Sequence, residues 1–432
     1  MRRYESYKDS GVEWLGEVPH CWDVKKVKNI FHLIAEPAAK NNQCELLSVY
    51  TDIGVKPRAE LEERGNKAST TDGYWIVKKG DIVVNKLLAW MGAIGLSEYD
   101  GVTSPAYDIL RPHQQINGKF FHYLFRTPLC LSEFKKNSRG IMDMRLRLYF
   151  EELGNIYIPF PSYPEQQKIA QFLDNKTAKI DQAVALAEKQ IALLKEHKQI
   201  LIQNAVTRGL NPDVPLKDSG VEWIGQVPEH WEVMRLKFML SEKLKYGANE
   251  SAELDDPEQP RYIRITDIDE QGNLKNDTFK SLEFEKAKDY LLKLNDILLA
   301  RSGATAGKSY IYKENLKNFA CYAGYLIRVR LEQKKFNAEF VNYYFQSVGY
   351  WDWIKSVNIQ ATIQNVSAEK YNDFLLSVPN LQEQVTIVDY LDQKTAKIDQ
   401  AIALKTAHIE KLKEYKSVLI DDAVTGKVQV SV

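Results

Sequence analysis

The sequence predicts a mixed α/β protein in which two globular domains alternate with two long helices that pack as an antiparallel coiled coil. Two internal repeats support this prediction. The block YKDSGVEWLGEVPHCWDV at 7–24 returns as LKDSGVEWIGQVPEHWEV at 216–233, and LDNKTAKIDQAVAL at 173–186 returns as LDQKTAKIDQAIAL at 391–404. The segments between these blocks share little residue identity. The sequence therefore indicates an internal duplication in which the blocks at the start and end of each half are preserved and the segment between them has diverged.

Each half begins with a globular segment of short strands and helices. β-rich runs such as GDIVVNK (80–86) and YLIRVRL (325–331) alternate with aromatic helical runs such as KFFHYLFRTPL (119–129) and AEFVNYYFQSV (338–348). The predicted division has four parts. They are a first domain at 1–160, a first long helix at 161–213, a second domain at 214–378 and a second long helix at 379–432.

The two long helices are predicted from apolar residues at steps of three and four. Such a stripe indicates a coiled-coil seam, and Ile180 and Ile398 are expected in it. Ser162 with Glu165, and Asn380 with Glu383, are expected to form capping boxes at the helix starts. Glycines follow the predicted ends of both helices. Lysines interrupt the seam at five positions: Lys176, Lys198, Lys394, Lys405 and Lys416.

Composition limits the classes of function. The 432 residues carry a formal net charge of zero, with 44% hydrophobic and 27% charged residues, which is typical of a globular protein. A protein that binds nucleic acid alone would usually have a basic excess, so such a role needs local patches or a partner. We expect a cytoplasmic protein, because we find neither a secretory signal nor an apolar run long enough to span a membrane. The four cysteines are far apart in sequence and predict reduced thiols without a metal site.

The sequence RSGATAGKS at 301–309 resembles a phosphate-binding loop. That loop needs four residues between its first glycine and the Gly-Lys pair, whereas Gly303 and Gly307 are separated by three. A hairpin turn is therefore the preferred interpretation. Motifs of dinucleotide binding, amino-methyl transfer and zinc proteolysis are not found in the sequence, so we expect no catalytic residue in this chain.

Candidate nucleic-acid contacts occur in corresponding places of the two halves. Arginine pairs with guanine edges, and asparagine or glutamine pairs with adenine edges, so equivalent loops with different side chains could read different sequences. The alternative is that these are ordinary solvated loops. The candidates in the first half are Lys86, Lys135, Lys136, Arg139, Arg145 and Arg147. Those in the second half are Arg301, Thr305, Lys308, Gln360, Thr362, Gln364 and Asn365.

Taken together, these stretches resemble one family, the specificity subunits of Type I restriction-modification systems. KDSGVEWLGEVPHCW and its copy look like the lead-in to a target recognition domain. GDIVVNK, NDILLARSGATAGKS and ATIQNVSAEKYNDFLLSVPNLQEQ look like its body and exit, and the LDNKTAKIDQAVAL repeats look like the conserved helical regions. The first domain departs from the pattern where MDMRLRLYFEELGNIYIPFP replaces the usual polar exit loop.

The resemblance implies that each domain reads one half of a bipartite DNA target. It also implies two methylation subunits and restriction subunits as partners, with S-adenosylmethionine, ATP and Mg bound by those subunits and none in this chain. The repeated octapeptide KTAKIDQA is the expected docking surface for the methylation subunits, and Lys179, Asp181, Lys397 and Asp399 are expected to point away from the seam. Its candidate residues are Lys176, Lys179, Asp181 and Gln182 in the first copy, and Lys394, Lys397, Asp399 and Gln400 in the second.

Two alternatives remain at this stage. The identity of the octapeptide could preserve only the packing of the seam. The whole chain could also be a coiled-coil adaptor that presents two protein-binding heads and does not contact DNA.

Overall fold

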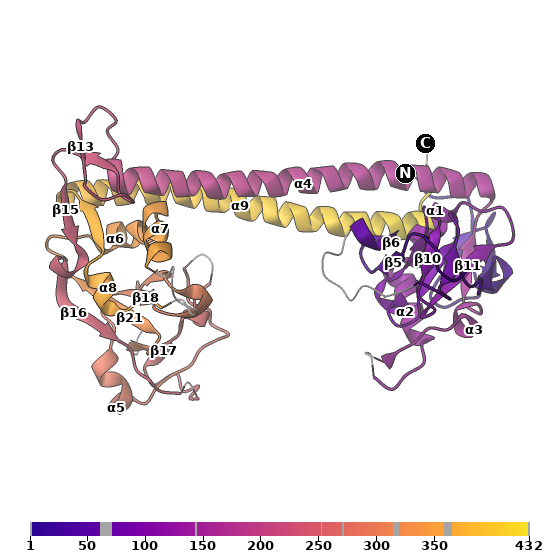
Figure 1. Ribbon diagram of the computed structural model, residues 1–432, viewed down its shortest axis with the longest axis horizontal. Coiled ribbons are helices and arrows are strands. Elements are labelled where there is room, and N and C mark those ends of the chain that lie inside the picture. The colour runs from indigo at the N-terminus through magenta and orange to yellow at the C-terminus, as the bar shows by residue number, and fades with distance from the viewer. Residues whose placement is uncertain are drawn as a thin grey trace. The chain divides into compact units, whose positions relative to one another are not determined.

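The computed structural model describes residues 2–60, 71–142, 145–251, 253–269, 272–313, 319–357 and 365–430. The chain forms two compact units, one of Met1–Ala187 with Ala407–Val432 and the other of Glu188–Thr406. Each unit is mixed α/β and contains part of both long helices, α4 (Tyr163–Arg208) and α9 (Leu381–Val424) (Figure 1). The predicted fold class is confirmed. The predicted four-part domain division stays a prediction.

The first unit is built on a four-stranded antiparallel sheet. Its strand order is β4 (Phe31–Ile34), β11 (Tyr107–Pro112), β8 (Ile82–Asn85) and β9 (Ile94–Leu96). Strand β8 is the predicted run GDIVVNK, and its four residues are all buried, which explains why it is continuously apolar until Asn85. The remaining strand pairs are β1 (Tyr7–Asp9) with β2 (Glu17–Pro19), β3 (Asp23–Lys26) with β12 (Tyr157–Phe160), β5 (Leu47–Tyr50) with β6 (Gly54–Pro57), and β7 (Trp75–Val77) with β10 (Gly101–Thr103).

Two short helices supply much of the aromatic core of this unit. Helix α1 (Gly118–Phe125) starts at Asn117, whose side chain accepts hydrogen bonds from the first-turn amides. Helix α2 (Pro128–Lys136) starts at the cap Thr127, and its Pro128 occupies a position where no backbone donor is needed. A further helix, α3 (Phe150–Leu153), precedes β12.

The second unit repeats this framework. Its four-stranded sheet has the order β16 (Leu240–Tyr246), β21 (Leu326–Leu331), β18 (Ile297–Ala300) and β19 (Ser309–Ile311). The other pairs are β13 (Leu216–Asp218) with β14 (Gln226–Pro228), β15 (Glu232–Arg235) with β22 (Leu375–Val378), and the parallel pair β17 (Arg261–Ile263) and β20 (Ala320–Tyr322). Its short helices are α5 (Phe284–Ala287), α6 (Ala338–Tyr344), α7 (Val348–Ser356) and α8 (Ala368–Asn372).

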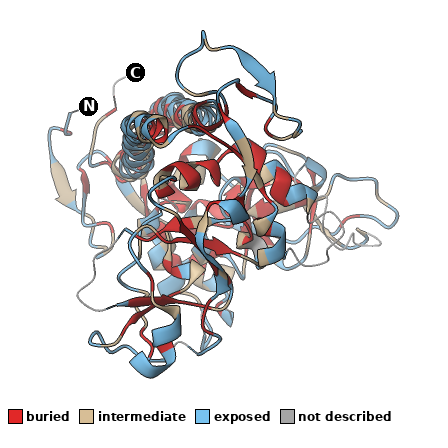
Figure 2. Cartoon of the chain, turned by 90° about the vertical axis from the view of Figure 1, so that its left-hand side faces the viewer, coloured by how far each residue is buried: buried red, intermediate tan, exposed pale blue. Residues whose placement is uncertain are grey.

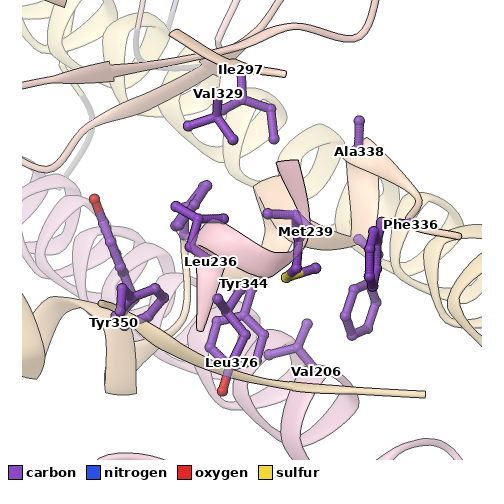
Figure 3. Close-up of a cluster of buried hydrophobic side chains, with 14 of the residues drawn as sticks. Val206, Leu236, Met239, Ile297, Val329, Phe336, Ala338, Tyr344, Tyr350 and Leu376 are labelled. Atoms are coloured by element: carbon purple, nitrogen blue, oxygen red, sulfur yellow. The ribbon is translucent and has the colours of Figure 1, made fainter. Parts of the chain in front are cut away.

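The core of the second unit joins the sheet, the short helices and the long helices. Ile297 and Val329 from the sheet lie in one cluster with Tyr344 of α6, Tyr350 of α7 and Val206 of α4 (Figure 3). Burying each large apolar side chain stabilises the fold by about 1.5–3 kcal/mol. The end of α4 is therefore part of the domain core as well as part of the seam.

An ion pair between an arginine and a buried aspartate recurs at the same place in both sheets. Arg111 of β11 forms two hydrogen bonds, of 2.8 and 2.7 Å, with Asp81. Arg330 of β21 forms the matching pair with Asp296, at 2.7 and 2.6 Å. Glu242 also accepts from Arg330 and Arg328, and these guanidinium groups lower its pKa to about 2. Each pair fixes the start of the central hairpin to the neighbouring strand.

The two long helices pack antiparallel, as predicted. Asp181 binds Lys416, Gln190 binds Lys405 and Asp399 binds Lys198, so partner numbers fall along α9 as they rise along α4. These three lysines interrupt the apolar seam because each has a partner on the facing helix. Lys176 and Lys394 lie over Phe172 and Tyr390 of their own helices, at 5.8 and 5.6 Å from the ring centroids. Figure 2 views these helices nearly end-on, and much of their surface is exposed.

Two predictions about the helices are corrected. Asp181 and Asp399 were expected to point away from the seam, but both carboxylates bind lysines of the facing helix at 2.7 Å. The capping boxes are also wrong in part. Asn380 does cap α9, whereas the Glu383 carboxylate accepts from Trp231 at 3.1 Å, and Glu165 accepts from Tyr4 at 2.6 Å. These glutamates tie the lead-in segments to the helices.

Candidate nucleic-acid interface

The two units present equivalent loops between the last two strands of their central sheets. In the first unit the loop runs from Lys86 to Gly92, and the Lys86 carbonyl accepts from Leu148 at 2.9 Å. In the second unit the loop begins at Arg301, whose carbonyl accepts from Val366 at 2.8 Å. The shared hydrogen bond shows that the same backbone frame carries both loops. The antiparallel pairing of β18 with β19 confirms that 301–309 forms a hairpin turn.

The base of each loop is held by a different side chain. The Gly92 carbonyl accepts from Arg126 Nη1 at 2.6 Å, and the Gly307 carbonyl accepts from the Tyr350 hydroxyl at 2.7 Å. Arg126 also donates to the carbonyls of Thr51 and Ile94. Burial lowers the pKa of Arg126 and raises that of Tyr350. The loops are therefore anchored by a half-buried arginine in the first unit and a buried tyrosine in the second, which suits a surface that must recognise a partner by shape.

In the second unit, the side chain of Arg301 is held by contacts with two other residues of the same unit. Its guanidinium lies over the Tyr246 ring, 4.7 Å from the centroid, and its Nε donates to Asn365 Oδ1 at 3.5 Å. Tyr246 is itself fixed, because its hydroxyl accepts from the Ala368 amide at 2.9 Å. Tyr325, which is 68% exposed, accepts the Arg301 amide through its backbone carbonyl. Arginine stacked in this way retains donors for a base edge or a phosphate.

In the first unit, the corresponding charge is already neutralised. Lys86 Nζ lies 3.3 Å from Asp108, and the desolvation of this carboxyl raises its pKa in spite of the lysine. This ion pair argues against a phosphate contact by Lys86. Arg139 likewise forms an ion pair with Glu152. Arg145 and Arg147 are exposed and form no ion pair within the part of the chain that the structure describes.

The other predicted contacts are divided between described and undescribed residues. Lys135 lies over the Trp90 ring at 4.9 Å, and Lys136 is exposed near Glu13 and Glu133. Lys308 is exposed and Thr305 is half-buried. The predicted contacts Gln360, Thr362 and Gln364 lie outside the described residues.

The repeated helical block also binds a tyrosine of a short helix inside each unit. The Tyr123 hydroxyl of α1 donates to Asp174 at 2.8 Å and is hydrogen-bonded to the Thr177 hydroxyl at 3.4 Å. The Tyr343 hydroxyl of α6 donates to Asp392 at 2.6 Å and is hydrogen-bonded to the Thr395 hydroxyl at 3.2 Å. Part of the sequence identity is therefore explained by anchoring each domain to its long helix.

A second anchor lies one turn into each long helix. The buried Gln166 accepts from the Asn117 amide and donates to the Pro161 carbonyl, at 2.8 and 2.9 Å. Gln384 forms the matching bonds with Asn337 and Pro379, at 2.7 and 2.8 Å. The sequence analysis missed both anchors, although a glutamine three residues after the start of each long helix is a detectable signal.

The remaining identical residues face outward. Lys179 and Gln182 on α4, and Lys397 and Gln400 on α9, are exposed and form no ion pair or side-chain hydrogen bond with any described residue. The same face continues to Leu186 and Leu404, which are 57% and 65% exposed. Neither seam packing nor domain anchoring accounts for the identity of these exposed positions.

Two units that repeat one framework and share a pair of long helices define an internally duplicated mixed α/β protein. A family model for the Type I restriction modification DNA specificity domain matches the chain twice, at 19–195 and 228–414. The chain therefore belongs to this family, as the resemblance in its sequence predicted. The adaptor alternative receives no support from this comparison.

Curated relatives match almost the whole chain. The Type I restriction enzyme MjaVIII specificity subunit of Methanocaldococcus jannaschii is 23% identical, covering 96% of this chain and 94% of that protein. The StySPI specificity subunit of Salmonella potsdam is 24% identical, covering 89% and 84%. The EcoKI specificity subunit of Escherichia coli is 22% identical over the same shares.

Solved structures share the fold at low sequence identity. A chain from a structure on the assembly and conformational transition of the type I R-M system has a TM-score of 0.73 and 13% identity, covering 95% of this chain and 99% of its own. The HsdS subunit from Thermoanaerobacter tengcongensis has a TM-score of 0.54 and 13% identity, covering 95% and 98%. Among the described residues, no helix is both long and apolar enough to cross a membrane.

Proposed function

We propose that this chain is the sequence-specificity subunit of a Type I restriction-modification complex. Each unit reads one half of a bipartite DNA target, and the chain itself carries out no catalysis. Two methylation subunits and the restriction subunits assemble on it. Those partners bind S-adenosylmethionine, ATP and Mg, and this chain binds none of them.

The observation that carries this proposal is the pair of equivalent loops. One backbone frame presents Arg301 in the second unit and an apolar loop with Leu88 and Met91 in the first. A chain that read the same sequence twice would need the same side chains twice. Different side chains on a repeated frame suit two different half-sites.

The docking surface for methylation subunits is proposed to be the outward face of the repeated helical block. Lys179, Gln182 and Leu186 recur as Lys397, Gln400 and Leu404. Two copies of one surface can bind two copies of one partner. Exposed leucines beside lysines and glutamines also suit an interface with an apolar centre and a polar rim.

The docking proposal is tested by charge reversal. In the variant Lys179→Glu with Lys397→Glu, the complex isolated after co-expression should lose methylation subunits, because both copies of the surface are changed. Lys195→Glu, an exposed lysine of α4 outside the repeated block, is the matched control. Unchanged stoichiometry in the double variant, measured by mass photometry, would contradict the proposed surface.

The recognition proposal is tested by a methylation map. The chain is co-expressed with its methylation subunit in a host without adenine methylation, and N6-methyladenine is located by sequencing. A two-part motif that appears only when this chain is present supports the proposal. A stable complex that methylates no defined motif would refute DNA reading by this chain.

A further inference from the structure

The loop of the first unit exposes an unusual cluster of apolar side chains. Leu87, Leu88 and Met91 are 38%, 39% and 49% exposed, within the eight residues that connect β8 to β9. These three side chains are not members of the hydrophobic core clusters of this unit. Exposed apolar side chains that lie close together often mark a binding surface, because contact with a partner removes their apolar area from water.

The backbone of the loop is held by hydrogen bonds in spite of this exposure. The Leu87 amide and carbonyl bind Asn85 Oδ1 and Trp90 Nε1, both at 3.1 Å, and the Leu88 carbonyl accepts from the Ala93 amide, also at 3.1 Å. Arg126 holds the Gly92 carbonyl at the base of the loop. The apolar tips are thus presented in one arrangement, which is what a specific contact requires.

Three basic residues lie on segments that contact the loop. Lys135 lies over the Trp90 ring, and the segment that pairs with the loop at Leu148 contains the exposed Arg145 and Arg147. A partner that meets this surface must offer negative charge beside apolar groups. The major groove of DNA does so, because phosphates flank it and the C5-methyl of thymine projects into it.

We propose that Leu87, Leu88 and Met91 read thymine in the first half-site through contact with its C5-methyl group. The inference rests on the proposed function and names the base chemistry that this loop recognises. Insertion between base pairs is the other apolar contact with DNA, but it requires unstacking at a cost of a few kcal/mol. The methyl group can be reached without that cost.

The second unit supplies the contrast. Its loop places Arg301, Ser302 and Thr305 where the first loop has Lys86, Leu87 and Trp90. Arg301 is stacked on Tyr246 and has donors suited to guanine rather than to a methyl group. Removal of thymine methyl groups should therefore weaken binding at the first half-site. Substitutions in the loop of the first unit should leave recognition of the second half-site unchanged.

The test removes the methyl group alone. Deoxyuridine pairs with adenine as thymine does but lacks the C5-methyl. Equilibrium binding is measured for the complex of this chain with its methylation subunits, on duplexes of the mapped motif with single thymines replaced by deoxyuridine. The variants Leu88→Ala and Met91→Ala are compared with Leu33→Ala, an equally exposed leucine on the edge strand β4 of the same unit.

The expected result is an affinity loss of about tenfold at one or more thymines of one half-site, within the range for a lost base contact. Leu88→Ala or Met91→Ala should bind the thymine duplex more weakly and no longer distinguish it from the deoxyuridine duplex, whereas Leu33→Ala should behave as wild type. Selective binding of the motif with equal affinity for thymine and deoxyuridine everywhere would overturn this inference alone. Loss of all sequence selectivity in the wild-type complex would instead overturn the proposed function.

Discussion

Replacement of Asp421 by asparagine should stabilise the protein at neutral pH. Asp421 lies near the end of α9, and its Oδ1 is buried without a hydrogen-bond partner among the described residues. Desolvation raises its pKa from 3.8 to about 6, opposed by Lys427 and reinforced by Asp422. The repeat places Gln203 at the corresponding point of α4, where its Oε1 accepts from the Gly349 amide at 2.9 Å. A neutral amide therefore suits this place in the fold.

The magnitude follows from the pKa. A rise from 3.8 to about 6 corresponds to roughly 3 kcal/mol at about 1.4 kcal/mol per unit, which is an upper limit for a partly buried group. We expect a gain of about 1 kcal/mol for Asp421→Asn at pH 7. For a unit of about 200 residues this raises Tm by roughly 2–4 °C.

The sign of the pH dependence provides a second test. The folded carboxyl has the higher pKa, so the folded state holds a proton between pH 3.8 and about 6 that the unfolded state releases, and stability falls as pH rises through this window. The advantage of Asp421→Asn should thus be present at pH 7 and vanish near pH 4. Scanning calorimetry from pH 4 to 8 measures this, with Glu414→Gln, the same loss of a carboxylate at an exposed position of α9, as control. Equal Tm values for wild type and Asp421→Asn at pH 7 would refute the reasoning.

Three further predictions concern the second unit. Asp296→Ala should destabilise it by about 1.5–3 kcal/mol in denaturant titrations, because the buried Arg330 would lose its two hydrogen bonds to Asp296 and keep only the half-exposed Glu242 as an acidic partner; a loss below 1 kcal/mol would contradict this. The pKa of Glu242 is lowered to about 2, so its ionised form stabilises the folded state fully above its ordinary pKa of 4.5, and this stabilisation is lost as pH falls toward 2. Glu242→Gln should remove that part of the acid sensitivity of unfolding, and an unchanged acid transition would argue against it. Arg301→Ala should relax the methylated motif at one guanine and cost about 1–3 kcal/mol of discrimination, whereas Tyr246→Phe, which keeps the ring, should have a smaller effect; a motif unchanged by Arg301→Ala would exclude this role.

Much of the architecture followed from pattern alone. The period of the apolar stripes predicted both long helices and their seam, because packing of a helix face depends on spacing that the sequence displays directly. Gly209 and Gly426, with φ of 73° and 79°, end α4 and α9 as expected. The hairpin interpretation of 301–309 rested on the spacing of its glycines, which is one residue too short for a phosphate-binding loop. The antiparallel pairing of β18 with β19 confirms it.

The candidate surface was predicted less completely. Sequence spacing identified Arg301 but not Tyr246, which lies more than fifty residues earlier and reaches it only through the sheet. Lys86 and Arg139 looked available for DNA because the sequence does not show Asp108 and Glu152 beside them. The apolar loop at 87–91 was overlooked, although its alignment with the polar loop of the second half was a visible signal.

The sequence by itself determined the duplication, the two long helices and the family, because repeats, periodicity and motif order are properties of the linear chain. Only the tertiary structure decided what each repeated residue does. In KTAKIDQA the threonine anchors a tyrosine of its own domain, the isoleucine is buried and the aspartate binds a lysine across the seam, while Lys179 and Gln182 remain exposed. These roles depend on residues brought close from distant segments, and such neighbours are fixed by packing rather than by order along the chain.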